Sequence, residues 1–350
     1  MSQIPSLVEF LRQSETQLRI FDMGRRVSKL SAETFNKVEQ AQVPYPSPFM
    51  HHAWIALLMW NPKLKDQNVV WFLKLPLDEQ GYLVQAARDD FMNRLMQNIS
   101  NVLSGDPDSA KKDALQDNPF SFKPEQEKMA IFHAHATLAI GQPASQYYEY
   151  AQQYFDGQLG YDQWQALGYQ GIADLVVRHD KGRNSEILTK AIPQLPDEVY
   201  EVLCTCLENI TPDHKLFAAL SARMQTSLQS DGTTANHVAA QIRAISNGHN
   251  EEAKRDLVLA VLNTEHALEA EVLAAIATRC NVSLRFPEVL KPYLEALAAG
   301  KSGQVGFSRI LADLMFMPDL RALILHVFRS PDRSEKLSEA IGQMFGNNLD

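Results

Sequence analysis

A carboxylate, a glycine and two arginines lie together between apolar runs in the stretch Phe-Asp-Met-Gly-Arg-Arg, residues 21–26. Backbone N–H groups at a glycine turn, flanked by guanidinium groups, can hold a phosphate or a carboxylate. A purely structural interpretation competes, because Asp22 can accept hydrogen bonds inside a hairpin turn while Gly24 takes a positive φ. The longer glycine pattern of a phosphate loop is missing. The sequence thus nominates Asp22, Gly24, Arg25 and Arg26 as ligand-binding residues for a small anion.

Two pairs of potential metal ligands occur in the chain, His133 with His135 and Cys204 with Cys206. Residues two apart on a helix point about 200° away from each other, so the two histidines cannot share a metal ion. The cysteine spacing is used neither by the C-x-x-C redox motif nor by zinc sites, and Cys206 falls on an apolar helical stripe. We therefore predict buried cysteines, no metal site and no cofactor.

Nucleophilic catalysis needs a hydroxyl or thiol placed beside a base, and the sequence contains no G-x-S-x-G or comparable motif. No catalytic residue is therefore nominated. Aromatic residues are dense in the segment YYEYAQQYF, residues 147–155. They could stack on a ligand, but their helical spacing and the few cations beside them favour packing between helices.

The composition is that of an ordinary globular protein with an acidic balance. The 350 residues carry a formal net charge of -9 and are 45% hydrophobic and 21% charged. This length indicates about two folded domains. An acidic chain lacks the broad basic face that coats nucleic acid, although Arg19, Arg25, Arg26 and Lys29 form one local basic group. We place nucleic acid last among the partners considered.

Nothing in the sequence predicts export or membrane insertion. The first residues, MSQIPSLVEF, lack the charged start and the unbroken apolar core of a secretory signal. The longest apolar runs, near residues 53–60 and 69–73, fall far short of the roughly 18 residues that span a bilayer. Three cysteines are an odd number and do not indicate a disulfide framework. These features predict a cytoplasmic protein without membrane contact.

The nominated residues fall in an N-terminal third that mixes helix and strand patterns. Apolar residues at helical spacing predict a short helix over 4–11, and residues 18–23 and 25–27 are predicted to be two strands joined at Gly24. Ser31 can cap the next helix, with Glu33 in its first turn. The runs 53–60 and 69–75 predict a second hairpin, with a buried helix turn as the alternative for the first run. Together these strands predict a small antiparallel sheet. Helices, among them one over residues 87–99, are predicted to cover one face of it.

The rest of the chain shows helical patterns alone. Residues 104–126 are rich in Asp, Ser, Pro and Lys and mark a loose connection. Helix starts are predicted near Tyr161, Asp197, Thr233, His266 and Ser302, a spacing of roughly 35 residues that holds two helices per interval. This spacing resembles solenoid-like helical hairpin arrays of the HEAT or armadillo type, with a plain bundle as the alternative. The prediction is an α+β, mostly α fold: an α+β domain over 1–105, a connection over 106–125 and a helical domain over 126–350.

Three segments carry a resemblance to a known family: RIFDMGRRVSKLS, WFLKLPLDEQGYLVQAARDDF and LADLMFMPDLRALILHVFR. They resemble an uncharacterised bacterial family known only as a domain of unknown function. The likeness covers most of the chain and implies a bacterial, cytoplasmic origin. It implies no activity, no ligand and no catalytic residue.

Two functional hypotheses of different class follow from these observations. The first is a non-enzymatic binding or scaffold protein whose helical array holds a partner protein, because stacked helical hairpins present long grooves. The second is a sensor or enzyme for a small anionic ligand, which Arg25 and Arg26 would grip in a cleft between the two domains. The first hypothesis leads, since the sequence offers no chemistry that competes with it.

Overall fold

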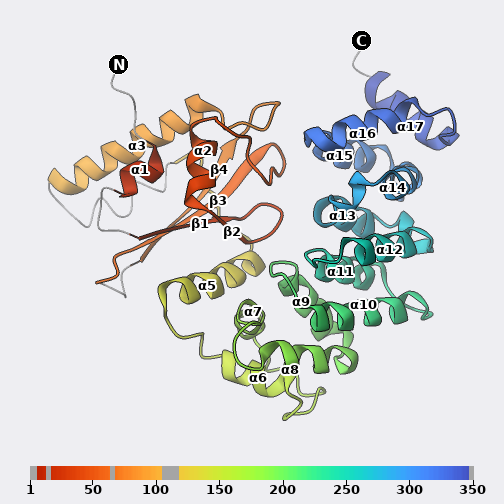
Figure 1. Ribbon diagram of the computed structural model, residues 1–350, viewed down its shortest axis with the longest axis horizontal. Helices are drawn as coiled ribbons and strands as arrows, with labels where there is room; N and C mark the ends of the chain where they lie inside the picture. The colour runs from red at the N-terminus through yellow and green to blue at the C-terminus, as the bar shows by residue number, and fades with distance from the viewer. Residues whose placement is uncertain (1–5, 13–16, 64–67, 105–117, 347–350) are drawn as a thin grey trace. The chain divides into compact units, whose positions relative to one another are not determined.

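A computed structural model describes residues 6–12, 17–63, 68–104 and 118–346 of the chain (Figure 1). The chain divides into two compact units, residues 1–129 with 139–142 and residues 130–138 with 143–350. Within the described residues the first unit combines helices with a sheet, and the second unit is helical. The fold is therefore α+β and mostly α, as the sequence predicts.

The first unit is built around an antiparallel sheet. Its elements are α1 (Leu7–Arg12), β1 (Gln17–Asp22), β2 (Ser28–Leu30), α2 (Ala32–Glu39), β3 (His52–Trp60), β4 (Asn68–Pro76) and α3 (Gln85–Ser104). Within the described part of the chain, the strands pair in the order β2-β1-β3-β4. Two antiparallel strand pairs are present as predicted, and the run 53–60 is a strand. The second strand of the first pair was placed too early, because residues 25–27 belong to the connection after β1 and β2 begins at Ser28. The first residues of the predicted opening helix and most of the predicted connection lie outside the described residues.

Both faces of this sheet are apolar. The β3 side chains 55–58 have no exposed surface, and successive side chains of a strand point to opposite faces. Trp71 of β4 meets Phe91 of α3 edge-on, with ring centroids 6.3 Å apart. Its neighbour Phe72 packs instead against Phe122 on the other face, at 5.9 Å. Figure 1 shows α1, α2 and α3 together on one side of the sheet.

Both ends of α2 are fixed by side chains. The Ser31 hydroxyl accepts the N–H of Thr34 at 2.9 Å, which confirms the predicted cap. At the other end, Glu39 is buried and accepts the backbone N–H groups of Leu7 and Val8 at the start of α1. Burial raises the pKa of this carboxyl, while these hydrogen bonds oppose the rise. The carboxylate thereby holds α1 against α2.

A strained two-residue turn precedes β3. Met50 and His51 both have left-handed backbone, with φ of 49° and 60°. Phe49 and His52 exchange two backbone hydrogen bonds across the turn, each 3.1 Å long. A turn with positive φ at both central positions normally carries Asn-Gly. Left-handed backbone costs an ordinary side chain roughly 1–2 kcal/mol per residue, so this turn holds strain.

Replacing Met50 with Asn and His51 with Gly should stabilise the first unit by about 1–2 kcal/mol, because both new residues fit left-handed backbone. Urea unfolding followed by tryptophan fluorescence measures the change, since Trp54, Trp60 and Trp71 lie in β3 and β4. Met50→Leu keeps the strain and should be neutral. A lower unfolding midpoint for the double variant would contradict the presence of strain.

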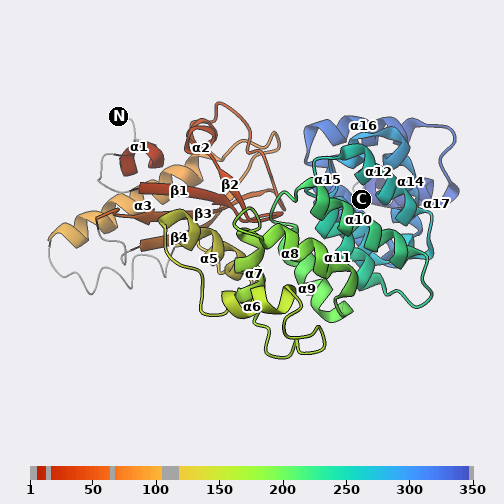
Figure 2. The same ribbon diagram turned by 60° about the horizontal axis from the view of Figure 1, so that its bottom comes forward.

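The second unit is a series of helices. They are α5 (Gln126–Ile140, shared with the first unit), α6 (Tyr148–Phe155), α7 (Tyr169–Val177), α8 (Asn184–Ala191), α9 (Asp197–Leu207), α10 (His214–Leu228), α11 (Ala235–Ile245), α12 (Glu251–Leu262), α13 (Ala270–Arg279), α14 (Pro287–Ala299), α15 (Gly303–Met315), α16 (Pro318–Arg329) and α17 (Glu335–Gly346). Short 3-10 turns lie at Ile192–Gln194, Glu265–Leu268 and Ser283–Arg285. Figure 2 shows the same helices from a second direction.

These helices pack in two rows. Helices α7, α9, α11, α13 and α15 contact one another in turn, and α6, α8, α10, α12 and α14 form the second row. Four predicted helix starts lie within four residues of the starts of α9, α11, α13 and α15. The fifth, near Tyr161, is wrong because that residue lies in the connection between α6 and α7. Gly157 and Gly160 have φ of 78° and 79° there, which a right-handed helix cannot contain.

A buried ion pair fixes the first helices of this unit. Asp174 of α7 and Arg178, the residue that directly follows α7, lie one turn apart. Their side chains are 1% and 8% exposed, and 2.6 Å separate Oδ1 from Nη1. The Nη2 of Arg178 donates to the Thr137 hydroxyl of α5 at 2.9 Å. The Oδ2 of Asp174 accepts the N–H of Ser145, before α6, at 3.1 Å. One ion pair thus joins three segments of the chain.

Candidate functional site

The predicted anion site lies in the turn between β1 and β2. Asp22 is 4% exposed, its Oδ1 accepts the N–H of Gly24 at 3.0 Å, and its Oδ2 accepts the hydroxyl of Tyr45. Burial raises the pKa of Asp22 to about 7, against the opposing effects of both hydrogen bonds and of the nearby Lys128 and Arg25. The carboxyl group is therefore engaged inside the turn.

The other three nominated residues lie in the same turn. The Nε of Arg25 donates to the carbonyl of Pro48 at 3.0 Å, and its guanidinium lies 5.6 Å from the ring centre of Phe49. The prediction of a positive φ at Gly24 is wrong. A Cβ at this position would make a tight contact, 3.2 Å from the Cβ of Phe49. Arg26 is half-buried. The anion-binding role of this turn stays a prediction.

Lys128 of helix α5 contacts this turn, and the sequence did not nominate it. Its Nζ donates to the carbonyl of Met23 at 2.9 Å and to that of Gly24, and it lies 5.7 Å from the ring centre of Phe49. The lysine follows Met23 by 105 residues. A local pattern carries no signal for a contact over such a separation.

The candidate metal ligands lie on two helices, the histidines on α5 and the cysteines on α9. On helix α5, His133 is exposed and His135 is buried. Cys204 and Cys206 are both fully buried, and burial raises the pKa of the Cys204 thiol. Within the described ranges, no three His, Cys, Asp or Glu residues are grouped so that they could hold a metal ion.

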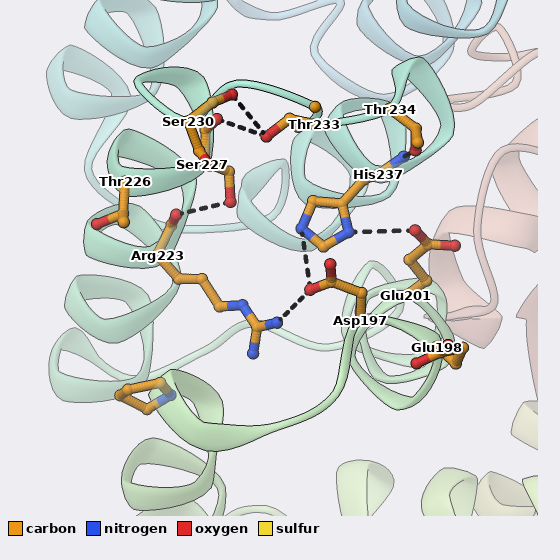
Figure 3. A pocket seen from close by; sticks show the side chains of 12 residues that line it. Asp197, Glu198, Glu201, Arg223, Thr226, Ser227, Ser230, Thr233, Thr234 and His237 are labelled. Carbon is orange, nitrogen blue, oxygen red and sulfur yellow. Dashed lines mark hydrogen bonds and ion pairs between the residues drawn. The ribbon is translucent and has the colours of Figure 1, made fainter.

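A pocket of about 430 Å³ lies in the second unit (Figure 3). The N-terminal ends of α9 and α11 meet there with the second half of α10. Its charged and titratable lining comprises Asp197, Glu198 and Glu201 from α9, Arg223 from α10 and His237 from α11. Hydroxyl groups complete the wall, from Thr226, Ser227, Ser230, Thr233 and Thr234. None of these residues carries a sequence motif that nominates it for a site.

The guanidinium of Arg223 is committed to the fold. Its Nη2 donates to the Oδ1 of Asp197 at 2.8 Å and to the carbonyl of Leu195 at 2.9 Å. Its Nη1 donates to the carbonyl of Ile192. The same group stacks on the ring of Tyr200, 3.7 Å from the ring centre. Arg223 therefore closes the pocket wall and has little capacity left to bind a ligand.

His237 is held between two carboxylates. The imidazole is 6% exposed, and its Nδ1 lies 3.1 Å from the Oε1 of Glu201. Its Nε2 faces the Oδ1 of Asp197 at 3.8 Å, which is too long for a hydrogen bond. The Thr234 hydroxyl caps α11 by accepting the His237 backbone N–H at 3.1 Å. This cap and Glu201 set the direction of the ring.

The electrostatic balance of the pocket is negative. Its carboxylates outnumber its guanidinium by two, and the side chains of Asp197 and Glu201 are 71% and 36% exposed. Asp197 and Glu198 lie in the first turn of α9, where acidic residues are ordinary partners of the helix dipole. A ligand that reaches this pocket meets carboxylate and hydroxyl oxygens. The arrangement can accept a cation with N–H groups.

The pocket shows no activated nucleophile. The Ser227 hydroxyl donates to the carbonyl of Arg223 at 3.0 Å and accepts from the Nε2 of Gln241 at 2.8 Å. Among the described side chains, no hydrogen bond joins the imidazole of His237 to a hydroxyl group; its Nδ1 contacts Glu201 instead. The Ser-His pairing that acyl transfer requires is thus not formed here.

One sequence signal was available for this pocket. Residues 196–198, Pro-Asp-Glu, have the composition of a helix N-terminus. That signal predicts helix α9 but not its neighbours, because Arg223 and His237 follow on later helices, 26 residues after Asp197 and 36 residues after Glu201.

Comparison with known proteins adds a family and no activity. A family model described as "Protein of unknown function (DUF3549)" matches residues 2–345. No curated protein and no solved structure matches the chain. Across the described ranges, every helix is too short or too polar to cross a membrane.

Proposed function

Since this chain belongs to the DUF3549 family, whose function is unknown, we propose a role from its own geometry: it is a protein-binding scaffold whose helical unit takes a basic side chain of a partner into the pocket between α9, α10 and α11. One observation carries this proposal. Three carboxylates line a pocket whose guanidinium is already bound by backbone carbonyls, a carboxylate and an aromatic ring.

The architecture supports a partner that is a polypeptide. Helical hairpins packed in two rows expose long edges and faces, which other proteins of this architecture use to bind extended segments and helices. The pocket lies where the N-terminal ends of α9 and α11 meet the second half of α10 and the loop that follows it. A lysine or arginine side chain has the length to enter a pocket from a peptide that lies along the surface.

The first test uses Glu198→Gln and a fluorescein-labelled peptide of alternating lysine and glycine. We expect the wild-type protein to bind this peptide, and the variant to bind it about threefold to tenfold more weakly, because one exposed carboxylate of the pocket is lost. Fluorescence anisotropy at low salt measures both affinities. The same peptide with glutamate in place of lysine should not bind.

Glu252→Gln is the matched control. Glu252 is exposed and occupies the second position of α12, as Glu198 does in α9, but it is not part of the pocket. This control should bind the lysine peptide as the wild type does. Equal weakening by both variants would mean diffuse charge attraction, and an absence of binding by the wild type would end the proposal.

A further inference from the structure

We infer that the pocket selects cations that carry N–H groups, the unmethylated side chains of lysine or arginine, and that His237 determines this selection. The inference rests on the proposed function and names the ligand chemistry of the same site. Its basis is a pair of acceptors, the Nε2 of His237 and the Oδ1 of Asp197, which face each other at 3.8 Å.

The tautomer of the neutral ring follows from its other partner. A carboxylate accepts hydrogen bonds and cannot donate them, so the Nδ1 of His237 carries the proton in its contact with Glu201. The Nε2 of the neutral ring is then an acceptor with a lone pair. It faces the Asp197 oxygen, which is also an acceptor. Two acceptors in this position repel each other unless a donor is placed between them.

A single ammonium group can supply that donor. A nitrogen atom can lie about 2.9 Å from each of two acceptors that are 3.8 Å apart, and both distances are normal for hydrogen bonds. Arg223 already donates to the same Asp197 oxygen at 2.8 Å, and a carboxylate oxygen has a second lone pair for another donor. A trimethylated ammonium has the same charge but no N–H group, so it cannot bridge the pair.

The acceptor pair is fixed in place before a ligand arrives. The groups that face His237 are Asp197, Glu201 and the Tyr200 ring from α9, with Arg223 of α10 beside them. The Tyr200 ring centre lies 5.6 Å from that of the imidazole. Because the imidazole is 6% exposed, its neighbours hold its orientation. Little conformational entropy remains to be lost when a ligand binds.

The test compares two peptides of equal charge, the lysine-glycine peptide and its trimethyl-lysine form, at about pH 8. We expect the wild-type protein to bind the lysine peptide about tenfold more tightly, as loss of hydrogen bonds to a charged group predicts. His237→Phe removes the acceptor and should reduce this ratio to about twofold or less. His237→Gln keeps an acceptor oxygen and should retain most of the ratio.

The outcomes separate this inference from the proposal on which it depends. Equal binding of both peptides by the wild type overturns the selection for N–H groups. The proposal that the pocket binds a basic side chain is then still supported. Binding of neither peptide ends the proposed function itself. If His237→Phe keeps the full ratio of affinities for the two peptides, His237 does not determine the selection. If His237→Phe does not fold, loss of the ratio in a folded His237→Gln overturns the acceptor role.

Discussion

Asp174→Ala is expected to destabilise the helical unit by about 3–5 kcal/mol. The substitution leaves the Arg178 guanidinium buried without its carboxylate, and breaking one side of a buried ion pair costs this much. It also removes the acceptor for the Ser145 N–H. Urea unfolding followed by circular dichroism at the helix band measures the loss, because the described part of the second unit is helical.

Two comparisons make this prediction specific. Asp90 and Arg94 of α3 form an Asp-Arg pair at the same spacing, with both side chains nearly half exposed, so Asp90→Ala should cost less than about 0.5 kcal/mol. A double variant, Asp174→Leu with Arg178→Met, buries apolar groups in place of charges and should be more stable than Asp174→Ala alone. A cost below about 1 kcal/mol for Asp174→Ala would mean that water reaches the Arg178 guanidinium when the carboxylate is gone.

The second large effect is a loss of stability in the first unit as the pH rises from about 4 to about 8. Burial raises the pKa of Asp22 from 3.8 to about 7, so the folded state binds this proton more tightly than the unfolded state does. The resulting stabilisation is fully present below pH 3.8 and is lost as the pH rises through about 7. At 1.36 kcal/mol for each pKa unit, the loss is about 3–4 kcal/mol.

Asp22→Asn tests this dependence directly. The amide oxygen can still accept the Gly24 N–H, and the amide nitrogen can donate to the Tyr45 oxygen, but the group no longer ionises. Relative to wild type, the variant should gain about 3–4 kcal/mol between pH 4 and pH 8. Glu39 also has a raised pKa but titrates in both proteins, so its effect cancels in the difference. Parallel pH profiles, measured by tryptophan fluorescence, would refute the prediction.

These two effects fall on different parts of the chain and have different meaning for function. The ion pair on α7 supports the helix stack that presents the α9–α11 pocket. The titration of Asp22 concerns the turn that the sequence nominated for an anion. A ligand that binds this turn must compete with the contacts that Arg25 and Lys128 already make to backbone carbonyls.

The sequence by itself determined the features that depend on neighbouring residues. Ser31 and Glu33 specified the start of α2, and alternation of apolar side chains specified β4. The length of the apolar run 53–60 fitted a strand, but periodicity did not separate it from a buried helix turn. Four of the five predicted helix starts fall near the starts of helices in one row, because apolar stripes and turn residues recur there at similar intervals. The prediction of a left-handed Gly24 was wrong because β1 and β2 are joined by residues 23–27, a longer connection than the tight turn that needs such a glycine.

Only the tertiary structure decided which charges meet. Arg223 and His237 lie on separate helices, and neither belongs to a sequence motif. The packing of the helices places both beside Asp197. The contact of Lys128 with Gly24 spans 104 residues. Pairing over such distances depends on how whole helices pack, whereas periodicity records only the residues within a turn or two of the chain. The acidic pocket is therefore a property of the stacked helices, and no single segment carries it.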